Sequence, residues 1–288
     1  MSDLDASHDE ALARFRELLR IPTVSHADES LIDWQPFSDF HAAVERLYPR
    51  LHATLAREVV DGHSLLYRWP GASASDPLVV MAHLDVVPVV EEEWGHAPFA
   101  AEIVGEGEDA AIHARGAIDD KGSLVAILEA VEQLAGEGFV PAHDVYLSFG
   151  HNEETAGGGA QAIVALLRER GVEPGLVIDE GGAVVDGVLP GVSVPTAMVG
   201  VAERGVMTLH LTAREAGGHA STPPAMPATA RLARAIGRVH RHPFPTRIAP
   251  PVRAMFATVA PHAPQPLRWL FGSLGVTGPL VAAALPKL

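Results

Sequence analysis

Four short segments of the chain hold side chains that can bind a metal ion. His83 and Asp85 stand at positions i and i+2, so an extended chain places both on one face, and the Asp85 carboxylate can hold the second ring nitrogen of His83. The other segments are pairs of adjacent acids: Asp119–Asp120, Glu153–Glu154 and Asp179–Glu180. Imidazole plus carboxylate suits zinc, manganese or cobalt better than calcium or magnesium. The sequence therefore predicts a site with nitrogen and oxygen ligands.

Alternating strands and helices are expected to position these segments. Apolar runs predict strands at 77–83, 144–149 and 176–178, and periodic apolar positions predict helices from Lys121 to Gly136 and over 159–170. This alternation predicts an α/β fold with a mostly parallel sheet flanked by helices. Sites in such sheets form at the carboxyl ends of the strands. We therefore expect the four segments to meet at one edge of the sheet.

Each segment also has a simpler explanation when it is taken alone. One aspartate of Asp119–Asp120 could be the N-cap of the helix that follows, and Glu153–Glu154 could lie in a solvent loop. Several carboxylates at one sheet edge would repel one another, and a bound cation would relieve that repulsion. A carboxylate shared between two ions would make a two-metal site. Of two adjacent glutamates, one could bind metal while the other moves protons.

The remaining elements suggest a second domain. A capping box at Ser7 and Glu10 predicts a first helix that ends before Pro22, and a second helix is expected near 38–56. After Val199 the pattern changes: residues 206–212 alternate like a half-buried strand, and a helix is expected at 228–240. The tail from His242 onward is rich in proline and shows no clear periodicity. We expect two domains, residues 1–198 and 199–288.

Composition narrows the class of protein. The net charge of −15 argues against nucleic-acid binding and against docking on an anionic membrane surface. The absence of cysteine excludes disulfides, thiolate metal sites and cysteine nucleophiles. The N-terminus is acidic and polar, unlike a signal peptide, and no apolar run approaches a membrane span. We therefore expect a cytoplasmic protein with no nucleic-acid or membrane partner.

Six motifs, in order, resemble metallopeptidase family 20, which includes aminoacylase, carboxypeptidase S, carboxypeptidase G and succinyl-diaminopimelate desuccinylase. They are HLDVVP (83–88), GAIDDKGS (116–123), HNEETAGGGA (151–160), IDEGG (178–182), ERG (203–205) and GGHASTPP (217–224). The carboxypeptidase S and N-acyl-amino-acid hydrolase branch resembles the chain most. The resemblance implies a zinc-peptidase-like α/β catalytic domain with an inserted α+β lid or dimerisation domain. It also implies a cis peptide bond between Asp119 and Asp120.

The resemblance also implies a role for each site residue. His83 would bind one metal, Glu154 the other, and Asp119 would bridge both. The last ligand in this half of the site is either Asp179 or Glu180, because family members use either acid at this strand end.

Three further residues would take part in catalysis without binding metal. Asp85 would orient His83, and Glu153 would be the general base and acid. His219, in the lid, would stabilise the oxyanion of the reacting carbonyl. Asn152 stands where the family usually has aspartate, which is a minor departure.

The implied activity is hydrolysis of an amide or peptide bond that releases an amino acid. Substrates would be small peptides or N-acyl amino acids, the cofactor two zinc ions with cobalt or manganese as substitutes, and the assembly a homodimer through the lid. Family members supply a final histidine ligand beyond the lid, whereas this chain stops at Leu288. We therefore expect a C-terminally truncated, incomplete lid, one tightly bound metal at most, and little activity of this polypeptide alone. The alternative is a non-catalytic remnant that acts as a binding or dimerisation module.

Overall fold

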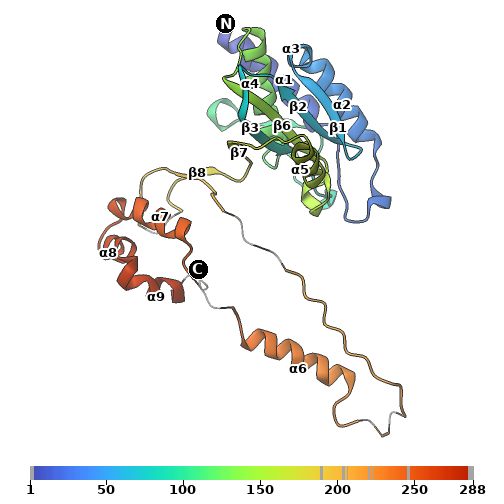
Figure 1. Ribbon diagram of the computed structural model, residues 1–288, viewed down its shortest axis with the longest axis vertical. Coiled ribbons are helices and arrows are strands. Elements are labelled where there is room, and N and C mark those ends of the chain that lie inside the picture. The colour runs from blue at the N-terminus through green and yellow to red at the C-terminus, as the bar shows by residue number, and fades with distance from the viewer. Residues whose placement is uncertain are drawn as a thin grey trace. The chain divides into compact units, whose positions relative to one another are not determined.

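A five-stranded sheet forms the centre of the first part of the chain (Figure 1). The strands lie in the order β1-β2-β6-β3-β7: β1 Ala56–Val60, β2 Ser64–Trp69, β6 His143–Gly150, β3 Ser73–His83 and β7 Leu176–Ile178. β3 pairs in parallel with both β6 and β7, whereas β2 pairs antiparallel with β1 and β6. The carboxyl ends of β3, β6 and β7 therefore lie at one edge of the sheet, as the sequence predicts.

The computed structural model describes residues 3–188, 191–202, 205, 207–219, 221–222, 224–244 and 247–284. The chain divides into two units, Met1–Glu180 and Gly181–Leu288. The segments with metal-binding side chains all fall in the first unit, and His219 falls in the second. The domain boundary expected at residue 199 stays a prediction.

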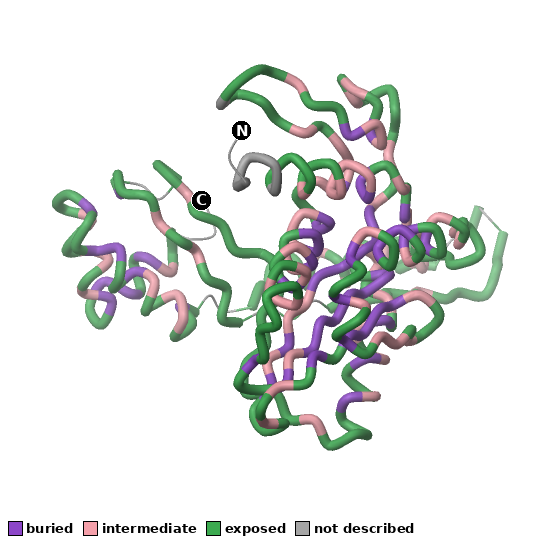
Figure 2. Tube along the Cα trace, turned by 90° about the horizontal axis from the view of Figure 1, so that it is seen from above, coloured by how far each residue is buried: buried purple, intermediate pink, exposed green. Residues whose placement is uncertain are grey.

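Helices cover both faces of the sheet in the first unit, so the strand residues that lie between sheet and helices are buried (Figure 2). Alternate residues of each strand face opposite layers: Leu65 and Leu147 pack in one apolar cluster, Leu66 and Tyr146 in the other. The first cluster joins the sheet to the helices α1 Asp3–Leu19, α2 Gln35–Leu47, α3 Pro49–Thr54 and α4 Lys121–Gly136. The second joins it to α5 Gly159–Glu169. This layering confirms the expected α/β class.

Short elements connect these layers. They are the 3-10 helices η1 Glu29–Leu31, η2 Glu91–Glu93, η3 Gly107–Asp109 and η4 Glu153–Thr155, and the hairpin strands β4 Glu102–Val104 and β5 Ala111–His113. The single helix expected near 38–56 is in fact two, because it breaks before Pro49. Tyr48 leaves the helical conformation (φ −124°, ψ 63°), since the proline ring disfavours that conformation in the residue before it.

The second unit holds more helix than its sequence predicts. A two-stranded sheet joins β8 Ala183–Val185 to β9 Thr196–Met198, and helices follow at α6 Ala228–Arg241, α7 Pro250–Val259, η5 Ala260–His262, α8 Leu267–Gly272 and α9 Leu274–Ala284. The tail expected to lack regular structure thus packs four helical segments around Phe256, Val259 and Val281. The strand expected at 206–212 is not found: residues 207–212 are exposed and pair with no described strand. Among the described residues, no helix has the length and apolar character to cross a membrane.

An aromatic cluster with three histidines packs beside the carboxyl end of β6. The His63 ring stacks on Trp34 at 4.3 Å and meets the ring of His151 edge-on at 5.9 Å. His41 Nε2 donates to the His63 carbonyl oxygen (2.8 Å). Burial lowers the pKa of His41 to about 4, and this hydrogen bond offsets only part of the shift. Folding therefore favours the neutral form of His41.

We expect the protein to lose stability as the pH falls from 6.5 towards 4. In that range the unfolded chain binds more protons than the folded chain, because the pKa of His41 is lowered by folding. The contribution of His41 to the free energy of unfolding should fall by about 2–3 kcal/mol. His41→Gln should remove this part of the loss, measured by urea denaturation at pH 7.5 and 4.5. His113→Gln, on exposed β5, is the control, and an equal effect of both variants would contradict the prediction.

Candidate metal centre

His83 is the last residue of β3 and lies at the centre of the candidate site. Its side chain is buried, with 2% exposed. Nδ1 lies 3.0 Å from the main-chain carbonyl oxygen of Asp85, which can only accept, so Nδ1 donates. Nε2 points the other way and lies 2.9 Å from Asp119 Oδ1 and 3.7 Å from Glu180 Oε2. The ring is thereby fixed with one nitrogen directed at a group of carboxylates.

Asp119 and Asp120 precede α4 and lie beside the end of β3. Their peptide bond is cis, as the resemblance implies. Asp120 occupies the N-cap position of α4 but makes no side-chain capping hydrogen bond. Instead it is buried, and its Oδ2 accepts from the main-chain N–H of His83 (3.2 Å). The N-cap explanation of this segment thus accounts for the position of Asp120 and not for its carboxylate.

Glu153 and Glu154 follow β6 and form the first turn of η4. Their main-chain N–H groups donate to the two carboxylate oxygens of Asp85, at 3.1 and 3.3 Å. Asp85 is completely buried, and its Oδ1 also lies 3.3 Å from His83 Nδ1. The sequence places Asp85 behind His83, but it gives no sign of the contact with η4. One carboxylate therefore joins the end of β3 to the turn that carries both glutamates.

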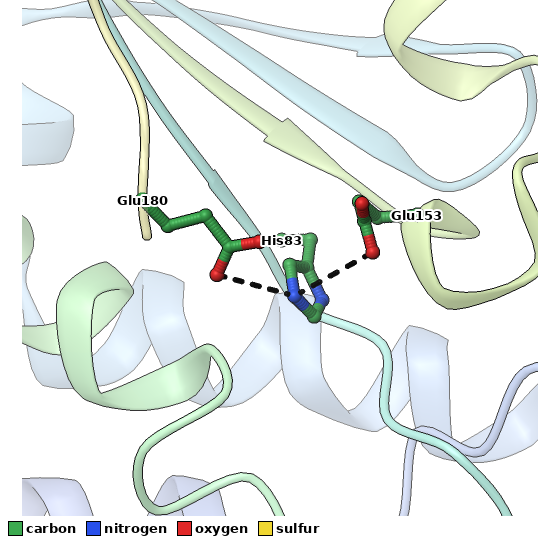
Figure 3. Close-up of side chains that lie close together, drawn as sticks. All are labelled: His83, Glu153 and Glu180. Atoms are coloured by element: carbon green, nitrogen blue, oxygen red, sulfur yellow. Dashed lines mark ion pairs between the residues drawn. The ribbon is translucent and has the colours of Figure 1, made fainter. Parts of the chain in front are cut away.

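Glu180, two residues beyond β7, faces His83 from the side opposite Glu153 (Figure 3). Two sets of ligand atoms lie within 4.8 Å of one another: His83, Glu153 and Glu180 in one, and His83, Asp119 and Glu154 in the other. Asp179 is in neither set. It is exposed, and its Oδ1 accepts from the main-chain N–H of Glu180 (3.0 Å). Of the two acids left open by the sequence, Glu180 is the one that the structure directs at His83.

The electrostatics of the site reflect this crowding of acids. Burial and the negative charges of Asp120 and Asp119 together raise the pKa of Glu180 to about 7, against the opposing effect of His83. Burial and neighbouring acids likewise raise the pKa values of Glu153 and Glu154. Burial lowers the pKa of His83, but hydrogen bonds to Asp85 and Asp119 outweigh it and bring the value to about 10. The site favours positive charge at its centre.

The donor atoms fit a divalent metal ion. One imidazole nitrogen and four carboxylates from three segments of the chain lie close together in two sets, and carboxylates gathered this closely are stabilised by a cation. Nitrogen and oxygen donors together are typical of zinc and of related transition metals. The orientation of His83 by a hydrogen bond from its other nitrogen is also typical of metal ligands.

The remaining sequence-predicted residues lie in the second unit. His219 Nδ1 is 2.7 Å from Ser221 Oγ in an exposed turn, and its role at the oxyanion stays a prediction. Glu203 and Arg204 of the ERG motif, and Ala220 and Pro223 of the motif at 217–224, lie outside the described residues.

A comparison with known protein families identifies the family of this chain. Residues 79–279 match the model of the peptidase family M20/M25/M40, and this range includes every metal-binding segment described above. The chain belongs to peptidase family M20/M25/M40. Membership in this family of metallopeptidases implies a divalent metal, in agreement with the donor set at the ends of β3, β6 and β7.

Curated M20 relatives resemble most of this chain. It is 35% identical to the N-fatty-acyl-amino acid synthase/hydrolase PM20D1 of Xenopus tropicalis over 93% of the chain and 52% of that protein. It is 33% identical to the probable carboxypeptidase S-like 2 of Dictyostelium discoideum over 96% of the chain and 54% of that protein. The chain spans about half the length of these relatives. A solved structure, the M20 family metallo-carboxypeptidase Sso-CP2 from Sulfolobus solfataricus, is 27% identical in sequence, with a TM-score of 0.49. The match covers 65% of this chain and 39% of the Sso-CP2 chain.

The pair Asp179 and Glu180 offers a matched test of the site. We expect Glu180→Gln to weaken zinc binding by at least about tenfold, because it removes a charged donor facing His83. Asp179→Asn should change zinc affinity less than twofold, since Asp179 is exposed and outside both ligand sets. Isothermal titration calorimetry with ZnCl₂ measures the zinc affinity of both variants. A larger loss for Asp179→Asn than for Glu180→Gln would show that the ligand is Asp179.

Proposed function

We propose that this protein hydrolyses an amide or peptide bond and releases a free amino acid, with two zinc ions as cofactor. The observation that carries the proposal is that His83, at the end of β3, has ligand atoms within 4.8 Å of two groups of acids, Asp119 with Glu154 and Glu153 with Glu180. Of these residues, His83, Asp119, Glu154 and Glu180 would hold the metal. Zinc, when bound, would polarise the substrate carbonyl and lower the pKa of water. Cobalt or manganese could replace it.

Glu153 would move the protons of the reaction. Its carboxylate lies 4.0 Å from His83 Nε2, at the metal centre, and its side chain is 55% exposed, so it can reach both water and a substrate. Burial and nearby acids raise its pKa above the ordinary glutamate value, a direction that suits a group that must both accept and donate a proton. Glu153 would take a proton from the attacking water and pass it to the leaving amine.

His219 would stabilise the negative charge that develops on the carbonyl oxygen, as an electrophilic donor from the lid. This assignment rests on the GGHASTPP motif at 217–224. A homodimer formed through the lid and a cytoplasmic location belong to the same proposal.

The substrate is proposed to be an N-acyl amino acid or a small peptide. Support comes from the names of the relatives, one group an N-fatty-acyl-amino acid synthase/hydrolase and the other carboxypeptidase S-like. Both names describe the same chemistry, an amide bond to an amino acid that carries a free carboxylate. The acyl group and the amino-acid side chain are separate variables in the assay below.

Release of free amino acid from N-acetyl amino acids, N-palmitoyl amino acids and dipeptides tests the proposal. The purified 288-residue polypeptide, supplied with ZnCl₂, should give a release of amino acid that chelation abolishes and that Glu153→Gln lowers. Zinc binding without any zinc-dependent release would instead favour a binding or dimerisation module. Absence of zinc binding would contradict the metal centre itself.

A further inference from the structure

Charge is distributed very unevenly along the chain. All 36 aspartates and glutamates lie within residues 1–215, which carry a net charge of −23. Residues 216–288 hold seven arginines and one lysine and no acid, and so carry +8. The net charge of −15, from which we expected no contact with anionic membranes, is therefore the sum of two parts of opposite charge. Because the Debye length is only about 8–10 Å at ordinary salt, a surface interacts through its local charge.

Four of the basic residues form one stripe on α6. Arg231, Arg234, Arg238 and Arg241 are spaced by three, four and three residues, which places them on the same face of a helix. All four are exposed, and the stripe extends about 15 Å along the helix axis. Arg231 lies 3.7 Å from Glu215, whereas Arg234 and Arg238 form no ion pair among the described residues. These two guanidinium groups thus keep their full charge for a ligand.

A hollow accompanies the stripe. It has a volume of roughly 570 Å³ and is lined by Met226, Arg231, Arg234, Ala235 and Arg238. Guanidinium groups match the geometry of phosphate oxygens, and three of them around one hollow would favour a phosphate group there.

Apolar side chains are exposed beside the arginines. Ile236 and Val239 are 53% and 51% exposed on another face of α6, and Phe244, three residues beyond the helix, is 85% exposed. A helix with arginines on one face and aliphatic residues on another lies in the plane of a membrane interface, with the apolar side in the acyl boundary. A nucleic acid would engage the arginines but would leave these aliphatic groups in water. The combination favours lipid.

We propose that α6 and the residues after it form a peripheral docking surface for anionic phospholipid membranes. The stripe Arg231, Arg234, Arg238 and Arg241 binds the phosphates of the headgroups, and Ile236, Val239 and Phe244 enter the interface. A basic residue at an anionic surface contributes about a fivefold gain in affinity (~1 kcal/mol). This surface contains none of the metal-binding residues, and the proposal does not depend on the proposed hydrolase activity.

Sedimentation of the full 288-residue chain with lipid vesicles tests the proposal. At 50 mM NaCl the chain should bind vesicles of phosphatidylcholine with 30% phosphatidylglycerol at least about tenfold more tightly than pure phosphatidylcholine vesicles. Raising NaCl to 500 mM should remove most of this difference, since the attraction is electrostatic. Equal binding to both vesicles, or none to the anionic ones, would overturn the proposal.

Matched charge reversals locate the surface. Arg234→Glu or Arg238→Glu changes the local charge by two units and should weaken binding to the anionic vesicles about 25-fold. Arg168→Glu, at an exposed position of α5 in the first unit, makes the same change in total charge and should have less than a twofold effect. An equal loss for Arg168→Glu would show that only the net charge matters, and would overturn the assignment to α6.

A soluble polyanion separates lipid from other anionic partners. Ile236→Ser should weaken vesicle binding severalfold, because it removes apolar area that enters the interface, and should leave binding to heparin unchanged. Heparin binding that depends on Arg234 and Arg238, without binding to anionic vesicles, would identify the partner as a soluble polyanion and overturn the membrane proposal. Circular dichroism of each variant confirms that its helix content equals that of the wild type.

Discussion

Replacing Glu153 by glutamine should lower kcat by about 10²–10⁴ and leave the zinc content of the protein nearly unchanged. The amide keeps the size of the side chain but cannot take a proton from water or return it to the leaving amine. His83, Asp119, Glu154 and Glu180 remain as donors in this variant. Steady-state kinetics together with metal analysis of the same preparation measure both quantities, so loss of chemistry and loss of metal are distinguished directly.

Two further variants, one at a proposed metal ligand and one control, show how this result is to be interpreted. Glu154→Gln should lose zinc affinity, because Glu154 shares a ligand set with His83 and Asp119. Glu92→Gln, on exposed η2, should leave both kcat and zinc content at the wild-type values. If Glu153→Gln instead loses zinc and keeps its activity per bound ion, then the roles assigned to Glu153 and Glu154 must be exchanged.

Asp85→Ala should have the largest effect on both stability and metal binding. The change leaves the main-chain N–H groups of Glu153 and Glu154 without their acceptor and removes the buried charge beside His83. Loss of one member of a buried, hydrogen-bonded charged group costs about 3–5 kcal/mol. Loss of a group that orients a metal ligand lowers metal affinity by about 10–100-fold. Urea denaturation and zinc titration measure the two effects.

Asp85→Asn separates the hydrogen bonds from the charge. The asparagine carbonyl oxygen can still accept from one of the two N–H groups, so the loss of stability should be smaller than for Asp85→Ala. Asp9→Ala, at an exposed position of α1, is the control and should be within about 0.5 kcal/mol of the wild type. Wild-type zinc affinity in Asp85→Ala would mean that η4 and His83 keep their positions without this carboxylate.

The sequence predicts the elements that carry the site because their signals are local. The apolar runs of β3 and β6 and the periodic positions of α4 and α5 specify buried strands and amphipathic helices. The parallel order of strand and helix then places His83 and Glu180 at the same edge. Contacts that depend on register and side-chain direction could not be predicted in this way.

Lys121 illustrates that limit. Its place after two aspartates predicts a local charge cluster, yet its completely buried Nζ donates to the carbonyl oxygens of Leu18 (3.2 Å) and Ile21 (2.6 Å) at the end of α1. About 100 residues separate these partners in sequence, so no local pattern could show them. By contrast, the unpredicted helix α7 does have a local signal in the sequence: prolines at its first turn and apolar residues at 252, 256 and 259 are typical of a helix start and a buried helix face.

The edge position of β7 has a consequence for how the ion is released. Among the described strands β7 pairs only with β3, through three residue pairs, and its three residues are 47–57% exposed. Segments with so few buried contacts open locally without unfolding of the whole domain. Amide hydrogens of β7 should therefore exchange with deuterium faster than those of β3 and β6 in the metal-free protein. Zinc held by Glu180 would bind only the closed form, so saturating zinc should slow exchange in β7 selectively, and opening of this strand would set the rate at which the ion escapes.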